Sequence, residues 1–308
     1  MIQEGGGRDK HISGYSGHQV KEPGDACVRD IRLRAGIQRV RGFEPARRGG
    51  HERRLMRPVG GEPGPKDHGD GQRDDKRGGA AESGDRRLYR KGLPFLRQFD
   101  TKVIVNICGG TVADYLEVVE RLSGQEIDML EANISCPNVE HGGIAFGQEP
   151  GMVEYITKEI KKKAAQPVSM KLTPNVTDIT EIAKAAEAGG ADALSLINTI
   201  TGMRIDVKKR AFCVANKTGG LSGPAIKPVA LRMVWQTCRA VSIPVIGMGG
   251  IQTAEDALEF IMAGAAAVAV GTANFRNPYA MPEIIGGLEK YMEENGIRDL
   301  KEIRGIVS

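Results

Sequence analysis

A cysteine among polar neighbours is the first candidate for chemistry in this sequence. Cys136 lies in Asn-Ile-Ser-Cys-Pro-Asn (133–138), directly after an apolar run. A thiol at the end of a strand, with polar surroundings, can act as a base or a nucleophile. Single cysteines are more often inert packing residues. Three others, Cys108, Cys213 and Cys238, are interpreted as packing or loop positions. No pair has CxxC spacing, so we predict no metal.

Polar residues end several other apolar runs. Lys171 closes Val-Ser-Met-Lys (168–171), and a lysine directed into a barrel mouth needs a partner such as an anionic or electron-rich cofactor. The alternative is an exposed charge at a strand end. Asn106, Asn133 and Asn198 can each donate and accept hydrogen bonds, which suits a planar, amide-rich ligand. Asparagines also cap turns, so no single one of them decides the matter.

Two glycine-containing turns have the composition of an anion site. Gly-Met-Gly-Gly (247–250) is followed by Gly271 and Thr272. Glycines let backbone N–H groups approach phosphate oxygens, and a helix N-terminus adds a favourable dipole. Thr253 is placed to cap the helix that follows the first turn. The glycines alone indicate only tight turns, but two such turns after consecutive strands favour phosphate binding.

The elements that must position these residues alternate between strands and helices after Gly92. Short apolar, β-branched runs predict strands, and amphipathic stretches between them predict helices. Strands this apolar on both faces are typical of a parallel sheet covered by helices. The predicted strands are Val103–Cys108, Ile127–Ile134, Val168–Leu172, Ala193–Asn198, Val245–Met248 and Ala267–Val270. The predicted helices are Val112–Leu122, Met152–Lys163, Ile179–Ala188, Lys227–Val241, Ala254–Met262 and Met281–Glu294.

This order predicts an α/β fold, a (β/α)8 TIM barrel. The candidate residues follow the carboxyl ends of the strands, where such barrels build their active sites, and the last two βα loops commonly hold a phosphate. Six βα units are recognisable, so the first two are missing. They would have to lie in the first 91 residues, which show no strand pattern.

Residues 1–91 differ in composition from the rest. They are rich in Arg and Gly, lack apolar periodicity and are predicted to be disordered. An RNA-binding tail is the alternative, although aromatic residues are scarce there. The net charge of the whole chain is +4, too small to imply nucleic acid. No apolar run reaches the roughly 18 residues of a membrane span, and no signal peptide is evident, so we expect a soluble, cytoplasmic protein.

Three segments carry a resemblance to a known family. They are Asn-Ile-Ser-Cys-Pro-Asn-Val-Glu-His-Gly-Gly-Ile-Ala-Phe-Gly (133–147), Thr-Gly-Gly-Leu-Ser-Gly-Pro-Ala-Ile-Lys-Pro (218–228) and Ile-Gly-Met-Gly-Gly-Ile (246–251). Together they resemble the catalytic subunit of dihydroorotate dehydrogenases of the NAD-linked class, known as class 1B. The resemblance extends from about Gly92 to the C-terminus and defines a barrel domain over residues 92–308.

The resemblance implies an FMN-containing TIM barrel that oxidises dihydroorotate to orotate in the synthesis of pyrimidines and UMP. It makes Cys136 the base that takes the C5 proton while hydride leaves C6 for FMN, and it places Lys171 beside the flavin ring. The other implied FMN contacts are Asn106, Asn133, Ile197, Gly223, Gly249, Gly250, Gly271 and Thr272. The implied substrate contacts are Asn133, Asn198 and Thr199.

The resemblance also implies partners. Members of this class work with a second subunit that carries FAD and an iron–sulfur cluster and passes electrons to NAD. The implied assembly is a homodimer core within a heterotetramer. Two rival interpretations stay open: a flavoenzyme like dihydropyrimidine dehydrogenase, which also has a Ser-Cys-Pro segment, and an inactive remnant or interaction protein that uses its Arg/Gly tail.

The first 91 residues depart from the family, whose first two strands and their ligand-binding loops should lie there. Shifting the codons by one base gives family-like motifs for residues 18–40, including NPVMPASGTFGFG, and for 61–84, including NAVGLQNPG. We therefore hypothesise that residues 1–91 are a frame-shifted translation. The barrel of the chain as written would then be incomplete, with unpaired strand edges and part of the FMN site unbuilt.

Overall fold

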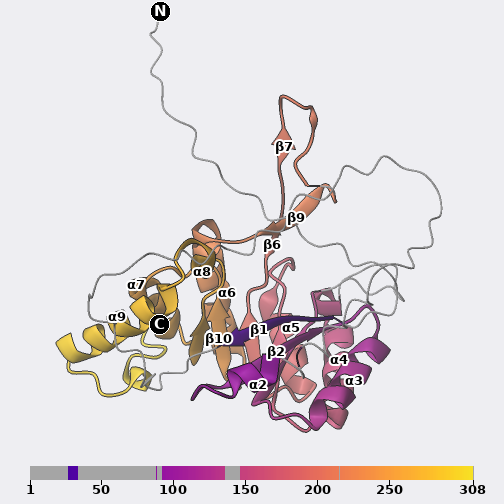
Figure 1. Ribbon diagram of the computed structural model, residues 1–308, viewed down its shortest axis with the longest axis horizontal. Coiled ribbons are helices and arrows are strands. Elements are labelled where there is room, and N and C mark those ends of the chain that lie inside the picture. The colour runs from indigo at the N-terminus through magenta and orange to yellow at the C-terminus, as the bar shows by residue number, and fades with distance from the viewer. Residues whose placement is uncertain (1–26, 34–87, 89–91, 136–145, 215, 308) are drawn as a thin grey trace, which may run out of the picture.

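The fold is a curled, mostly parallel sheet with helices along its outer face (Figure 1). The computed structural model describes residues 27–33, 88, 92–135, 146–214 and 216–307. The strand order is β1-β2-β3-β4-β5-β10-β11, with β1 antiparallel to β2 and every later pair parallel. The strands are β1 (Cys27–Leu33), β2 (Val103–Cys108), β3 (Met129–Asn133), β4 (Val168–Lys171), β5 (Ala193–Leu196), β10 (Val245–Met248) and β11 (Ala267–Ala269).

A helix follows each of the six parallel strands, so the predicted βα order is confirmed. Neighbouring helices pack against one another in sequence order along the sheet. The arrangement is a half-barrel of the (β/α)8 type. The helices are α2 (Leu93–Leu96), α3 (Val112–Ser123), α4 (Pro150–Lys163), α5 (Ile179–Ala188), α6 (Lys227–Ala240), α7 (Ala254–Met262), α8 (Ala273–Arg276) and α9 (Ala280–Glu294). Three 3-10 turns lie at Phe146–Gln148, Pro224–Ile226 and Leu300–Glu302.

Side-chain caps fix where several helices begin. Thr111 and Thr253 each accept a hydrogen bond from the N3 backbone amide, and the aspartate at N3 accepts one in return. Asp178 caps α5 in a simpler way, through the amide of Thr180. Such caps satisfy backbone donors that have no partner inside the helix. The predicted Thr253 cap is confirmed, and it sets the direction in which the chain leaves the turn after β10.

The two faces of the sheet differ in chemistry. The outer face packs on the helices in one large apolar core, which includes Leu130, Met170 and Leu194. The inner face carries Glu131 and Lys171, and a separate small apolar cluster forms around Ile246, Met248 and Ala269. The prediction that the strands are apolar on both faces is therefore wrong for the inner face of β3 and β4, which is polar.

A two-part hairpin between β5 and α6 forms an arm that the sequence analysis did not predict. Figure 1 shows it projecting from the body of the molecule. It has large exposed apolar side chains, among them Met203 and Val207. Its strands are β6 (Ile200–Met203), β7 (Ile205–Asp206), β8 (Ala211–Phe212) and β9 (Thr218–Leu221), paired β6 with β9 and β7 with β8.

Among the few residues described within the first 91, Cys27–Leu33 form a strand that was not expected. β1 pairs with the outer edge of β2, so the prediction that this segment contains no strand is wrong. Within the described residues the sheet does not close, because β1 lies at one edge and β11 at the other. The predicted disorder of residues 1–91 falls largely outside the described residues. No helix in the described ranges has both the length and the apolar character that a membrane span requires.

Candidate active site

The predicted polar residues meet at one edge of the sheet. Asn133 is the last residue of β3 and Lys171 the last of β4, and the two are direct partners across the parallel pair. Lys171 is in turn the partner of Ser195 in β5. Asn106, in β2, is buried, as is Lys171. The carboxyl ends of parallel strands lie together, so Asn133 and Lys171 are neighbours there, and Asn106 lies on the same face of the sheet one layer below.

Glu131 connects this layer and was not predicted. Its carboxylate accepts a hydrogen bond from Asn106 Nδ2 at 2.7 Å and another from Ser195 Oγ at 2.7 Å. The side chain is buried although the residue lies in the middle of β3. The sequence contained a signal, since an acidic residue between Leu130 and Ala132 needs a partner if it is buried.

The predicted substrate residues Asn133 and Asn198 are in direct contact. Asn198 Nδ2 donates to Asn133 Oδ1 at 3.1 Å, and the Thr199 amide donates to Asn198 Oδ1 at 2.9 Å. These bonds use the side-chain carbonyl oxygens of both asparagines. The three residues therefore act as one preorganised group at the ends of β3 and β5.

A polar cavity of about 330 Å³ opens beside this group. Asn175 holds its wall together: its Nδ2 donates to the Thr199 carbonyl at 3.1 Å, and its Oδ1 accepts from the Thr201 amide at 2.9 Å. The sequence analysis missed Asn175, although it follows Lys171 closely in the same βα loop. The lining residues are Ser135, Gln148, Thr173, Asn175, Asn198, Thr199, Thr201, Thr218, Gly219 and Gly220.

Two predicted glycines form the turn after β10, and a third, Gly223, packs against it from the chain before α6. Gly249 and Gly250 have φ angles of 133° and 77°, a region that side chains other than glycine rarely adopt. A Cβ on Gly250 would lie 2.8 Å from the carbonyl oxygen of Gly223. The turn after β10 and the chain before α6 therefore approach each other through their backbones. Backbone exposed in this way can bind an anion such as phosphate.

The second predicted turn lies beside the first. Met248 and Ala269 are partners in β10 and β11, so Gly250 and Gly271 each follow a paired residue by two positions. A Cβ on Gly271 would meet nothing within 4 Å, so this turn opens to space. The structure thus brings the two turns to neighbouring positions at the same edge, as predicted. Thr272 directly precedes α8.

Lys227 ties the glycine turns to the helices behind them. Its ammonium lies 2.7 Å from Asp256 Oδ1 and 2.9 Å from Glu259 Oε1. The hydrogen bonds to Asp256 and Glu259 raise the pKa of Lys227 against the effect of burial. Burial tends to raise the pKa of Asp256, but hydrogen bonds from Lys227 and from the amides of Gln252 and Thr253 leave it below its ordinary value. Both groups are therefore charged near neutral pH, and Lys227 is committed to this ion pair.

Ile197 lies where the strand ends meet the glycine turn. Its side chain is buried, and its amide donates to the Met248 carbonyl at 2.9 Å. A Cβ on Gly249 would lie 3.3 Å from Ile197 Cγ1. This predicted residue therefore supplies an apolar surface next to the turn, which suits contact with a flat ring.

Cys136, the predicted base, lies outside the described residues. The residues on both sides of segment 136–145 are described. The Gly147 amide donates to the Ile134 carbonyl at 2.8 Å, and Phe146 packs edge-on against Tyr115 with ring centroids 5.7 Å apart. Tyr115 also donates to the Asn133 carbonyl at 2.7 Å. Both ends of the segment are thus fixed at the carboxyl end of β3, next to Asn133.

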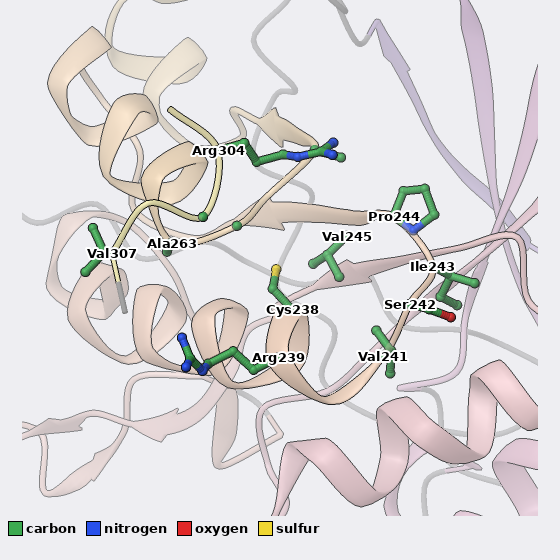
Figure 2. Close-up of a pocket in the computed structure, with 13 residues that line it drawn as sticks. Cys238, Arg239, Val241, Ser242, Ile243, Pro244, Val245, Ala263, Arg304 and Val307 are labelled. Atoms are coloured by element: carbon green, nitrogen blue, oxygen red, sulfur yellow. The ribbon is translucent and has the colours of Figure 1, made fainter. Parts of the chain in front are cut away.

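A second cavity, of about 320 Å³, lies at the amino ends of the strands, away from the candidate site (Figure 2). It opens at the amino end of β10, beside Pro244 and Val245, and none of the predicted site residues lines it. Cys238 of α6 faces it, and burial raises the pKa of this thiol to about 11. The packing role predicted for Cys238 agrees with this environment. The other two cysteines of that prediction are Cys108, which is buried, and Cys213, which is exposed.

The geometry can bind a planar, polar ligand that bears a phosphate. Amide side chains and an ammonium lie at the strand ends, the glycine turns follow the neighbouring strands, and a polar cavity is lined by Asn198 and Thr199. Among the described residues no group of three or more His, Cys, Asp or Glu side chains is placed to hold a metal ion. The class that the fold and site define is therefore a (β/α)8-type protein with polar side chains and glycine turns gathered at the carboxyl ends of its strands.

Comparison with known proteins identifies the family. The family model of dihydroorotate dehydrogenase matches residues 76–292, so the chain belongs to the dihydroorotate dehydrogenase family. It is 66% identical over 220 residues to a dihydroorotate dehydrogenase B (NAD(+)) catalytic subunit from Lachnoclostridium phytofermentans, covering 71% of this chain and 73% of that protein. The protein of the same name from Alkaliphilus metalliredigens is 62% identical over 218 residues, covering 71% and 72%.

A solved structure shows the same fold. The crystal structure of DHODH from Eimeria tenella in complex with ferulenol superposes with a TM-score of 0.54 at 25% identity. The match covers 63% of this chain and spans 57% of that one.

Proposed function

We propose that this chain is the catalytic subunit of an enzyme that oxidises dihydroorotate to orotate in pyrimidine synthesis. The observation that carries the proposal is that Lys171, the Asn133–Asn198 pair and the glycine turns all lie at the carboxyl ends of neighbouring strands. The family membership and the names of the relatives give this edge its substrate.

The described residues fit FMN as the cofactor. Gly223, Gly249 and Gly250 leave backbone where any larger residue would place a Cβ, which is the surface a phosphate requires. Ile197, Asn106 and Lys171 offer one apolar and two polar contacts nearby, and Gly271 and Thr272 complete the set. When bound, FMN would accept the hydride that leaves C6 of the substrate.

The chain's own residues would orient the substrate and move one proton. Asn133, Asn198 and Thr199 hold the polar edges of dihydroorotate, because their mutual hydrogen bonds fix which atoms face the ligand. Cys136 takes the proton from C5 as a thiolate. An ordinary cysteine has a pKa of about 8.5, so the rate should rise with pH as the thiol ionises.

Electrons would leave through a partner. The relatives are named catalytic subunits of NAD(+) enzymes, and we propose that this chain likewise works with a subunit carrying FAD and an iron–sulfur cluster. A homodimer core within a heterotetramer belongs to the same proposal. A cytoplasmic location and the absence of nucleic-acid and membrane partners stay predictions.

We further propose that residues 92–308 form the FMN domain and that residues 1–91 are a frame-shifted segment. The antiparallel β1 supports this, since a parallel barrel strand would belong at that edge of β2. The family model matches residues 76–292, so the match begins within the segment proposed as frame-shifted and covers most of the proposed domain.

The test is substrate oxidation with an artificial electron acceptor and added FMN, using the chain whose first 91 codons have been restored to the barrel frame. We expect activity with dihydroorotate and none with dihydrouracil, the substrate that the rival dihydropyrimidine dehydrogenase interpretation requires. Loss of a general base costs about 10²–10⁴ in rate, so Cys136→Ala should lose activity by that factor while its FMN affinity stays unchanged. Undiminished turnover by Cys136→Ala, or oxidation of dihydrouracil alone, would refute the proposal.

A further inference from the structure

Glu131 is a buried carboxylate that faces the inside of the curled sheet. Its side chain is 1% exposed, and its two hydrogen-bond partners come from β2 and β5, on either side of β3 and β4. Asn106 is its direct partner in β2, and Asn133 follows it by two residues on the same face. Glu131 therefore lies one layer, about 6–7 Å, below the strand-end residues.

The strand order fixes what lies over this carboxylate. β4 separates β3 from β5, so a side chain of β3 that reaches Ser195 of β5 must cross β4. The residues of β4 at this level are Ser169, the partner of Glu131, and Lys171, the partner of Ser195. The Glu131 carboxylate therefore crosses the inner face of β4 between Ser169, in its own layer, and Lys171, in the layer above.

The charges support the same placement. Burying a carboxylate is strongly unfavourable unless it is paired and hydrogen-bonded. Among the buried residues that the structure describes, Glu131 supplies the carboxylate and Lys171 the ammonium. Glu131 is 1% exposed and Lys171 is 3% exposed. They share one face of the sheet, so each lowers the cost of burying the other.

The hydrogen bond to Asn106 has a direct consequence for a ligand. Asn106 donates its amide nitrogen to Glu131, so its carbonyl oxygen must point the other way. Asn106 is thereby set as an acceptor, and Lys171 of the same face is a donor. The polar edge of an isoalloxazine ring carries a ring N–H between two carbonyl groups, which matches an acceptor and a donor in fixed positions.

We propose that Glu131 is a positioning residue for the flavin site: it holds Asn106 as an acceptor and keeps the Lys171 ammonium in place, without touching the cofactor. This inference rests on the proposed FMN function. It assigns a role to a residue one layer below the ligand and predicts that its charge is felt by the bound flavin.

The experiment compares Glu131→Gln with the unchanged full-length chain. FMN affinity is measured by quenching of flavin fluorescence, and the reduction potential of the bound flavin is measured by dye equilibration. We expect at least tenfold weaker binding, because glutamine can keep hydrogen bonds to Asn106 and Ser195 but loses the negative charge that lowers the cost of burying the Lys171 ammonium. We also expect a more positive potential, because removing a negative charge favours the reduced, anionic flavin.

Two further variants separate positioning from simple stability. Gln166 is buried and donates its Nε2 to the backbone carbonyl of Leu122 at 3.1 Å, at the amino end of β4. Gln166→Ala should lower the thermal stability and leave the flavin potential unchanged. Ser195→Ala removes one bond to Glu131 and keeps its charge, so it should weaken FMN binding by a few fold in the same direction. If Glu131→Gln does not fold, Ser195→Ala decides, and an unchanged affinity there overturns the inference.

A double variant tests the route of the effect. With Asn106→Ala already present, Glu131→Gln should weaken FMN binding less than it does alone, because neighbouring residues that act together are not additive. Equal FMN affinity and equal potential in Glu131→Gln and the parent would overturn the inference while the proposed function stands. A parent chain that binds no FMN even after its first 91 codons are restored to the barrel frame would refute the proposed function and the inference with it.

Discussion

Replacing Gly250 by alanine gives the most direct test of the glycine turn after β10. The residue has a φ of 77°, and left-handed backbone of this kind costs about 1–2 kcal/mol for an L-residue with a side chain. The new Cβ would also lie 2.8 Å from the Gly223 carbonyl oxygen and 2.9 Å from Lys227 Cβ. Overpacking of this kind costs about 1–3 kcal/mol, more so where the neighbour is backbone that cannot rotate away.

Together these effects should lower the free energy of unfolding by about 2–5 kcal/mol. For a domain of this size, each kcal/mol lowers Tm by about 2–4 °C, so thermal unfolding followed by circular dichroism should show a fall of about 4–20 °C. FMN affinity should fall at least tenfold, because the turn can relieve the contact only by moving its backbone away from the phosphate position.

Two other glycines supply matched controls. A Cβ on Gly271 would meet nothing within 4 Å, so the stability of Gly271→Ala should equal that of the parent. Its FMN affinity should fall if the open turn holds the cofactor. Gly286→Ala lies in α9 with nothing within 4 Å, and should raise stability by up to about 1 kcal/mol without affecting FMN. A Gly250→Ala protein that melts within about 2 °C of the parent would refute the packing argument.

Three further predictions follow from charges, thiols and the first segment of the chain. The folded pKa of Asp256 lies below its unfolded value of about 3.9. The stability that its ionised carboxylate contributes is therefore present above about pH 4 and is lost as the pH falls through the folded pKa. Asp256→Asn should flatten this acid dependence of the free energy of unfolding, measured by urea unfolding. Exposed Cys213 should react with a maleimide at about pH 7.5 much faster than Cys238, whose pKa is raised to about 11 by burial. Mass spectrometry of timed samples measures the two rates, and a faster reaction of Cys238 would contradict its buried position. Sequencing the DNA of codons 1–92 should reveal that a single-base change restores one barrel frame, and the restored protein should bind FMN at least tenfold more tightly than the chain as written; equal affinity would contradict the idea.

Local signals explain why the main elements were predictable. The apolar run of β2 and that of β10 are bounded by turn residues, and their predicted limits coincide with the observed ones. β5 ends earlier than predicted, at Leu196 rather than Asn198. The Asn198 side chain accepts from the Thr199 amide and donates to Asn133, and such side-chain bonds compete with strand geometry.

The arm and β1 had no comparable signal. The segment Thr218–Leu221 contains two glycines and is exposed throughout, so it has no apolar periodicity to detect. β1 is defined by backbone pairing along the outer edge of β2. A strand edge presents unpaired N–H and C=O groups to any chain that can reach it, and such pairing depends little on sequence.

The candidate site was predictable in its outer layer and not in the layer below it. Asn133, Lys171 and the glycines follow strand ends in the sequence, so the barrel rule alone brings them together. The partners of Glu131, by contrast, are 25 and 64 residues away, and nothing in the apolar sequence around it shows which residues they are. Side chains alternate between faces along a strand. The outward Leu130 and Ala132 made β3 look apolar, while Glu131 between them turns inward. That inner layer can stay polar because its amide, hydroxyl and carboxylate groups bond to one another. Its hydrogen bonds then determine which atoms of Asn106 remain for a ligand, so the interior of the sheet and the binding edge above it form one hydrogen-bonded unit.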